Sequence, residues 1–148
     1  MLSTTVHMGS FQQTAEPARA APGGCEYEDM GAVNIASMLA RFSEHWAPKK
    51  IAELNDYDVK VVKVLGDFTW HAHADTDELF LVIDGRLTIQ LRDSDVALGP
   101  GELFVVPRGA EHCPRAEVET AMLLMEPRGV VNTGDAGGDM TADLEMLT

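Results

Sequence analysis

Residues 78–106 read ELFLVIDGRLTIQLRDSDVALGPGELFVV, and this stretch decides the fold. Apolar side chains, many of them β-branched, occur in short runs with a period of two, which is typical of β-strands. Gly, Pro and Asp separate the runs, as expected of turns. Asp84-Gly85 predicts a hairpin with a type I′ turn, in which both central residues have positive φ. Gly99-Pro100-Gly101 predicts a second tight turn.

The same pattern continues on both sides of this stretch and predicts an all-β domain from Ile51 onward. The expected strands are Val59–Leu65, Phe68–His73, Glu78–Ile83, Arg86–Leu91, Asp95–Leu98, Leu103–Val106 and Thr120–Glu126. Ahead of them, apolar residues recur at near-helical spacing from Val33 to Phe42, with Asn34 and Ser37 as candidate caps, and predict one short helix. Many short strands with frequent turns favour a sandwich or a closed barrel.

Length and composition predict a single folded domain. The chain has 148 residues, of which 45% are hydrophobic and 24% are charged, as in ordinary globular proteins. We expect residues 1–32 to form a flexible amino-terminal extension, residues 33–130 the barrel with its leading helix, and residues 131–148 a carboxy-terminal tail. The two cysteines, Cys25 and Cys113, predict no disulfide framework.

Charge and hydropathy narrow the classes of partner. The net charge of −13 would repel nucleic acid and anionic lipid, so we expect neither as a partner. The chain contains no apolar stretch of membrane-spanning length, and its amino terminus does not resemble a secretory signal. The sequence therefore predicts a cytoplasmic protein.

Three histidines and one glutamate are the candidate functional residues. His71 and His73 share one face of an expected strand, because side chains alternate between the two faces. Glu78 follows after a short polar linker that lets the next strand return beside the first. A lone pair of histidines is more often surface or core structure than a site. Here a third histidine, His112, follows a strand and a bend controlled by Pro and Gly, which favours a site.

These residues resemble the two sequence motifs of the cupin superfamily, small β-barrels of the jelly-roll type. The first motif is matched by Gly66, His71, His73, Glu78 and Gly85, with one residue fewer than usual after Gly66. The second is matched by Gly101, Pro107, Gly109 and His112, whereas Ala116 occupies the position of the usual Asn. The resemblance implies a single-domain cupin in which His71, His73, Glu78 and His112 bind one metal ion.

The chemistry of these donors agrees with that implication. Three neutral imidazoles and one carboxylate suit a divalent transition metal ion such as Fe, Mn, Ni, Zn or Cu, and they do not choose among them. The donors cancel only one of the ion's charges, so the ion stays electrophilic, and octahedral geometry would leave two positions open. Thr69 lies two residues before His71, and Phe80 lies two residues after Glu78, so each should face the same side of its strand as that donor. Both are therefore predicted to line the pocket below the metal.

Three functions remain open from the sequence. The first is a metalloenzyme acting on a small organic molecule, for which the resemblance implies dioxygenase, isomerase or decarboxylase chemistry. The second is a non-catalytic sensor or binding barrel for a small ligand, and the third is a structural cupin with unused donors. Leu79, Leu81 and Ile83 form an apolar outward face. We expect a homodimer through this face unless the amino-terminal helix covers it.

Overall fold

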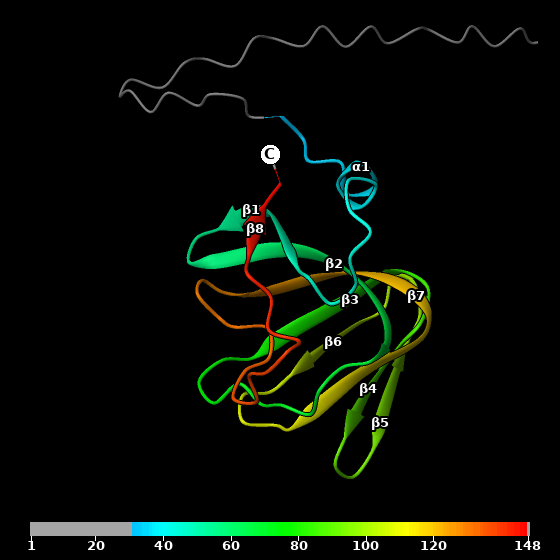
Figure 1. Ribbon diagram of the computed structural model, residues 1–148, viewed down its shortest axis with the longest axis vertical. Coiled ribbons are helices and arrows are strands. Elements are labelled where there is room, and N and C mark those ends of the chain that lie inside the picture. Colours follow the sequence, from blue (N-terminus) through cyan, green and yellow to red (C-terminus); the bar gives the residue numbers. More distant parts are fainter. Residues whose placement is uncertain (1–30, 148) are drawn as a thin grey trace, which may run out of the picture. The chain divides into compact units, whose positions relative to one another are not determined.

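The computed structural model describes residues 31–147, which form one helix and a connected sheet of eight strands around an apolar core (Figure 1). The helix is α1 (Ile35–Leu39), and the strands are β1 (Lys49–Leu54), β2 (Tyr57–Asp67), β3 (Glu78–Asp84), β4 (Leu87–Leu91), β5 (Asp95–Leu98), β6 (Leu103–Val106), β7 (His112–Pro127) and β8 (Glu145–Met146). The prediction of an all-β fold with a short leading helix is confirmed. The expected flexible extension lies, up to residue 30, outside the described residues. No helix within residues 31–147 is long and apolar enough to span a membrane.

The long strand β7 organises the sheet. One edge of β7 pairs with β2 over almost its whole length, from Tyr57 opposite Pro127 to Asp67 opposite Arg115. The other edge pairs first with β4 and then with β3, both antiparallel. Strands β3 and β4 are therefore consecutive in the chain but are not partners of each other. Strand β7 therefore joins β2, on one of its edges, to β3 and β4 on the other.

The hairpin predicted at Asp84-Gly85 is consequently wrong. Gly85 has a φ of +88°, whereas Asp84 belongs to β3 and is not among the residues with positive φ. The chain instead runs on along the same edge of β7 from β3 into β4, so closely that a Cβ on Gly85 would lie 2.8 Å from the carbonyl oxygen of Glu119. The Thr120 hydroxyl donates to the carbonyl of Arg86 and accepts from its N–H, which replaces the bonds of a hairpin.

The expected strand Phe68–His73 is also wrong. Strand β2 ends at Asp67, and the following residues form only an isolated bridge between His71 and His112. The connection still follows β7, but the register slips by one residue: Arg115 is opposite Asp67, whereas His112 is opposite His71, so no continuous ladder forms. Its backbone groups are still bonded, since the N–H of Phe68 donates to the carbonyl of Pro114 at 2.9 Å.

Other boundaries differ because charged residues hide the apolar pattern. Strand β7 begins at His112 rather than at the expected Thr120. Strand β1 was not expected, because Lys49, Lys50 and Glu53 interrupt its alternation. Strand β8 lies in the expected carboxy-terminal tail, pairs in parallel with β1, and is followed by the buried Leu147. The tail residues therefore pack on the barrel as far as residue 147.

The core has an inner and an outer part. The inner part fills the barrel with side chains from β2, β3, β4 and β7, among them Val62, Phe80 and Ile89. In the outer part, Leu39 at the end of α1 packs with Val61 and partly covers Ile83. Of the two candidate caps, Asn34 is the one that caps α1, by accepting a hydrogen bond from the N–H of Ser37 at 2.9 Å. The helix thus covers one part of the outward sheet face.

Candidate metal centre

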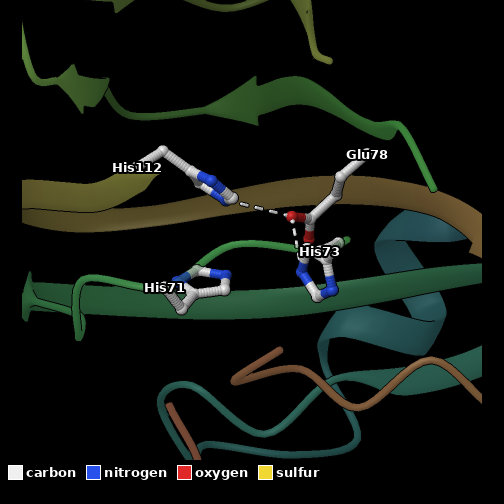
Figure 2. A group of neighbouring side chains, drawn as sticks. All are labelled: His71, His73, Glu78 and His112. Carbon is white, nitrogen blue, oxygen red and sulfur yellow. Dashed lines mark hydrogen bonds and ion pairs between the residues drawn. The ribbon is translucent and has the colours of Figure 1, made fainter. Parts of the chain in front are cut away.

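The structure brings His71, His73, Glu78 and His112 together inside one end of the barrel (Figure 2). We call this group the His/Glu cluster. All four residues are buried, and their ligand atoms lie within 4.8 Å of one another. Two histidines come from the connection after β2, while Glu78 and His112 are the first residues of β3 and β7. A group of this composition, size and burial could hold a metal ion.

Backbone contacts hold the histidine backbones in place. His71 and His112 exchange both backbone hydrogen bonds, at 2.9 and 3.0 Å. The N–H of Gly109 donates to the carbonyl of His73 at 2.8 Å, and Gly109 has a φ of +77°, a conformation that favours glycine. The Pro-Arg-Gly bend predicted from the sequence therefore positions two of the three histidines.

Hydrogen bonds to the backbone also determine which ring nitrogen faces the centre. Nδ1 of His71 lies 3.0 Å from the carbonyl of Thr69, and Nδ1 of His112 lies 3.0 Å from the carbonyl of Ala110. A carbonyl oxygen can only accept, so each Nδ1 carries a hydrogen and donates it. The Nε2 atoms face the cluster, and in the neutral ring each keeps its lone pair, as a metal ligand requires.

His71 is held in the neutral form. Burial, followed by the nearby His112, lowers the pKa of His71 to about 4. Its Nε2 atom is buried and has no hydrogen-bond partner among the described residues. An unpaired buried nitrogen costs roughly 1–3 kcal/mol. A metal ion bound at this atom would satisfy it, so this side chain fits the role that the sequence predicted.

Glu78 supplies the negative charge of the cluster. Its Oε2 atom lies 3.2 Å from Nε2 of His73 and 3.2 Å from Nε2 of His112. Burial opposes the charge, yet the contacts with His112 and His73 outweigh it and lower the pKa of Glu78. For His73, burial is likewise outweighed by the Glu78 carboxylate, and its pKa is raised. The cluster therefore attracts a cation, which is either a proton or a metal ion.

A small cavity lies beside the cluster. Its volume is about 30 Å³, and its wall is mostly apolar, with Trp46, Phe68 and Phe80 as the aromatic members. A space of this size holds roughly two water molecules. The structure brings the predicted pocket residue Phe80 to this wall but does not bring Thr69 to it. Thr69 instead contributes the carbonyl that orients His71.

Trp46 and Asn132 belong to the cavity wall and were missed by the sequence reasoning. Trp46 stacks on Phe68 at 4.8 Å between ring centroids, and Phe68 meets the edge of His71 at 5.3 Å. The φ of Trp46 is +60°, an uncommon conformation for a bulky residue. Neither residue belongs to a motif, and no pattern in the sequence places them beside the histidines.

A second charged pair lies inside the barrel. Lys60 and Glu126 are only 2% and 1% exposed, and Nζ lies 2.5 Å from Oε1. Leu79 is opposite Met125 across β3 and β7, so Glu78 and Glu126 are neighbours on the inward face. Burial and then the charge of Glu78 raise the pKa of Glu126. Strand parity with Val62 could have revealed that Lys60 points inward.

Three neighbouring residues take no part in the cluster. Asp77 is exposed and pairs with Arg108 at 3.3 Å. Cys113 is buried, its thiol donates to the carbonyl of Phe68, and burial raises its pKa. Ala116, at the position of the usual Asn, is 1% exposed and packs in the inner core. A polar contact from this position is therefore replaced by apolar packing.

Fold and site together define a small β-barrel protein with a buried group of three histidines and one glutamate at one end. Comparison with known families matches the cupin domain to residues 60–128. A cupin-2 domain protein of Shewanella frigidimarina is 48% identical, with 65% of this chain and 94% of that one covered and a TM-score of 0.64. The chain belongs to the cupin family.

Two further relatives have similar coverage. Protein NMB1881 of Neisseria meningitidis is 30% identical, with 66% of this chain and 99% of that chain covered and a TM-score of 0.60. The uncharacterized protein YdbB of Bacillus subtilis is 34% identical over 94 residues, which are 63% of this chain and 83% of the relative. These similarities support the same fold and the same family, but they specify no reaction.

Proposed function

We propose that this cupin binds one divalent transition metal ion through the His/Glu cluster and uses it to transform a small organic molecule. One observation carries the proposal. The Nδ1 atom of His112 donates to a carbonyl, so in the neutral ring the Nε2 lone pair faces the Glu78 carboxylate at 3.2 Å. A cation between these two atoms, either a proton or a metal ion, would satisfy both, and a metal ion would also satisfy the unpaired Nε2 of His71.

The wall of the cavity supports chemistry that depends on the ion. His71 and Glu78 are its only ionisable members among the described residues, and both belong to the cluster. A bound ion would supply Lewis acidity or activate oxygen at its free positions. The chain would bind and orient the substrate through the aromatic wall and exclude water from the site. Dioxygenase, isomerase and decarboxylase reactions are the candidates.

A non-catalytic sensor or binding barrel is the second candidate. The volume of the cavity, about 30 Å³, favours it because this space admits only a ligand of a few atoms. Turnover separates the two functions. A metal-loaded protein that binds small ligands but converts none of a panel of hydroxy acids, keto acids and phenols would be a binding barrel.

Metal content tests the proposed donors. His73→Ala removes one of four ligands, and we expect bound metal to fall at least tenfold after dialysis against trace metal. His45→Ala is the matched control, because His45 lies outside the cluster and pairs with Glu119 at 2.8 Å. Elemental analysis gives the metal content, and circular dichroism checks the fold. Full metal content in His73→Ala would refute the four-donor assignment.

We also propose a homodimer through the part of the sheet face that α1 leaves uncovered. Leu79 and Leu81 are partly exposed there, beside Leu103 at 56% and Val105 at 41% exposure. Two copies facing each other through this patch would bury these apolar side chains, which favours association.

A further inference from the structure

Residues 130–142, which we call the closing segment, lie across the end of the barrel that holds the His/Glu cluster. The N–H of Ala72 donates to Oδ1 of Asp135 at 2.8 Å, and the N–H of Asp135 donates to the carbonyl of Ala72 at 3.1 Å. Ala72 is the residue between two of the candidate ligands. In Figure 1 the orange part of the chain runs beside the green connection between β2 and β3.

Gly134 is the point of closest approach. A Cβ at this position would lie 2.3 Å from the carbonyl oxygen of Ala72 and 3.2 Å from Cδ2 of His71. A side chain here would therefore push the closing segment away from the histidines. Gly137, in the same segment, has a similar φ of +58°, against +51° for Gly134, but a Cβ there would meet nothing within 4 Å.

The closing segment is internally braced. The side chain of Asn132 donates to the carbonyl of Met140 at 2.9 Å and accepts from the N–H of Ala142 at 3.0 Å. Thr133 is fully buried. These bonds lie within the segment, whereas a longer one, from the Asn132 side chain to the carbonyl of Trp46 at 3.4 Å, joins it to the barrel. The bonds between Asp135 and Ala72 are of a different kind, since they join the segment to the ligand-bearing connection.

A solvent groove runs along this segment and touches the cluster only at His73. The groove has a volume of about 340 Å³ and runs between residues 72–76 and 130–135, with His73 in its wall. It is about ten times larger than the cavity behind the histidines, whose volume is about 30 Å³. Asn132 lines that inner cavity, so the closing segment forms a wall of both spaces.

The closing segment also lies outside the residues that match the family model. The match to the cupin domain ends at residue 128, just before the segment begins. The matched range includes the four candidate ligands and does not include the closing segment.

We propose that the closing segment is the gate of the metal site and determines which ligands enter it. While Asp135 is bonded to Ala72, only ions and molecules of a few atoms reach the His/Glu cluster, and larger ligands enter when this latch opens. Gly134 sets how tightly the gate closes. The inference rests on the proposed metal site, and its test includes a readout that does not need bound metal.

Two pairs of variants test the gate in the full-length protein. Asp135→Ala breaks the latch, whereas Asp139→Ala removes the same charge from an exposed position of the same segment. Gly134→Ala displaces the segment, whereas Gly137→Ala introduces the same backbone strain without the contact. We expect Asp135→Ala and Gly134→Ala to lose bound Zn²⁺ to excess 1,10-phenanthroline about tenfold faster than wild type, as expected for one lost hydrogen bond to a carboxylate. The two controls should stay within about twofold.

Histidine modification provides the readout without metal. In the metal-free protein, diethyl pyrocarbonate should modify His71 and His73 faster in Gly134→Ala than in Gly137→Ala, as measured by peptide mass spectrometry. Modification at equal rates in these two variants would overturn the gate, whatever the metal content. If no form of the protein binds Zn²⁺, the proposed function fails, and the modification rates alone then decide on the gate.

Discussion

Replacement of Lys60 by methionine should destabilise the protein strongly, because it leaves the buried carboxylate of Glu126 without its partner. Both side chains are at most 2% exposed, and Oε2 of Glu126 has no hydrogen-bond partner among the described residues. Glu126 is also the inward neighbour of Glu78, so a second negative charge lies close by. Breaking such a buried pair costs about 3–5 kcal/mol, whereas an exposed pair contributes about 0–1 kcal/mol.

Urea unfolding of the metal-free protein, followed by circular dichroism, measures this loss. With a slope of about 1–3 kcal/mol per molar urea, the midpoint for Lys60→Met should fall by roughly 1–3 M. Arg92→Met is the matched control, because its ion pair with Glu111 is about half exposed, with side-chain values of 55% and 53%. The double variant Lys60→Met/Glu126→Leu should return to within about 1 kcal/mol of wild type, because it removes both charges.

The pH dependence of Lys60→Met gives an independent check. Burial already raises the pKa of Glu126 in the wild type, and loss of the lysine raises it further. The folded variant then holds a proton that the unfolded chain has lost. The free energy of unfolding of the variant should therefore be larger at pH 5 than at pH 7, because it decreases as the pH rises through the raised pKa of Glu126. A loss below 1 kcal/mol at pH 7, or a double variant no better than the single one, would refute the reasoning.

Four further predictions concern the turn, the thiol, the helix and the outer face. Gly85→Ala should lower the free energy of unfolding by about 2–5 kcal/mol in thermal unfolding, because a Cβ would collide with β7. Gly66 has a similar φ but open space around it, so Gly66→Ala should cost only about 1–2 kcal/mol. Equal losses in the two variants would contradict the collision. Cys113 should react with iodoacetamide far more slowly in the folded than in the unfolded protein, because it is buried and its pKa is raised; equal rates, measured by mass spectrometry, would contradict this burial. Asn34→Ala should cost about 1 kcal/mol through loss of the helix cap, measured by urea unfolding, and no loss would show that the cap is not needed. Leu103→Lys should convert the proposed dimer to a monomer in light scattering while keeping the fold, and a dimer of unchanged stability would exclude this face as the interface.

Several features were predictable because they depend on neighbours in the sequence. The cap at Asn34 and the turn at Gly99-Pro100-Gly101 are decided within a few residues, and both occur as predicted. The parity of His71 and His73 survives although the expected strand does not form, because an extended backbone places side chains i and i+2 on one side whether or not it is paired. Period therefore sufficed for the fold class, and the resemblance of the residue spacing to the cupin motifs indicated the four candidate ligands.

Pairing between residues far apart in the sequence decided the features that the sequence did not predict. Asp84-Gly85 has the local preference of a hairpin, but β7 is long enough to pair with β3 and β4 in turn, and this pairing outweighs the turn. The bonds between Ala72 and Asp135 join residues far apart in the chain, and no local pattern encodes them. Apolar periodicity reports which way a side chain faces, whereas the identity of its partner depends on which strands meet. Residue spacing therefore names the candidate ligands, and only the tertiary structure reveals the buried ion pair beside them and the segment that closes the site.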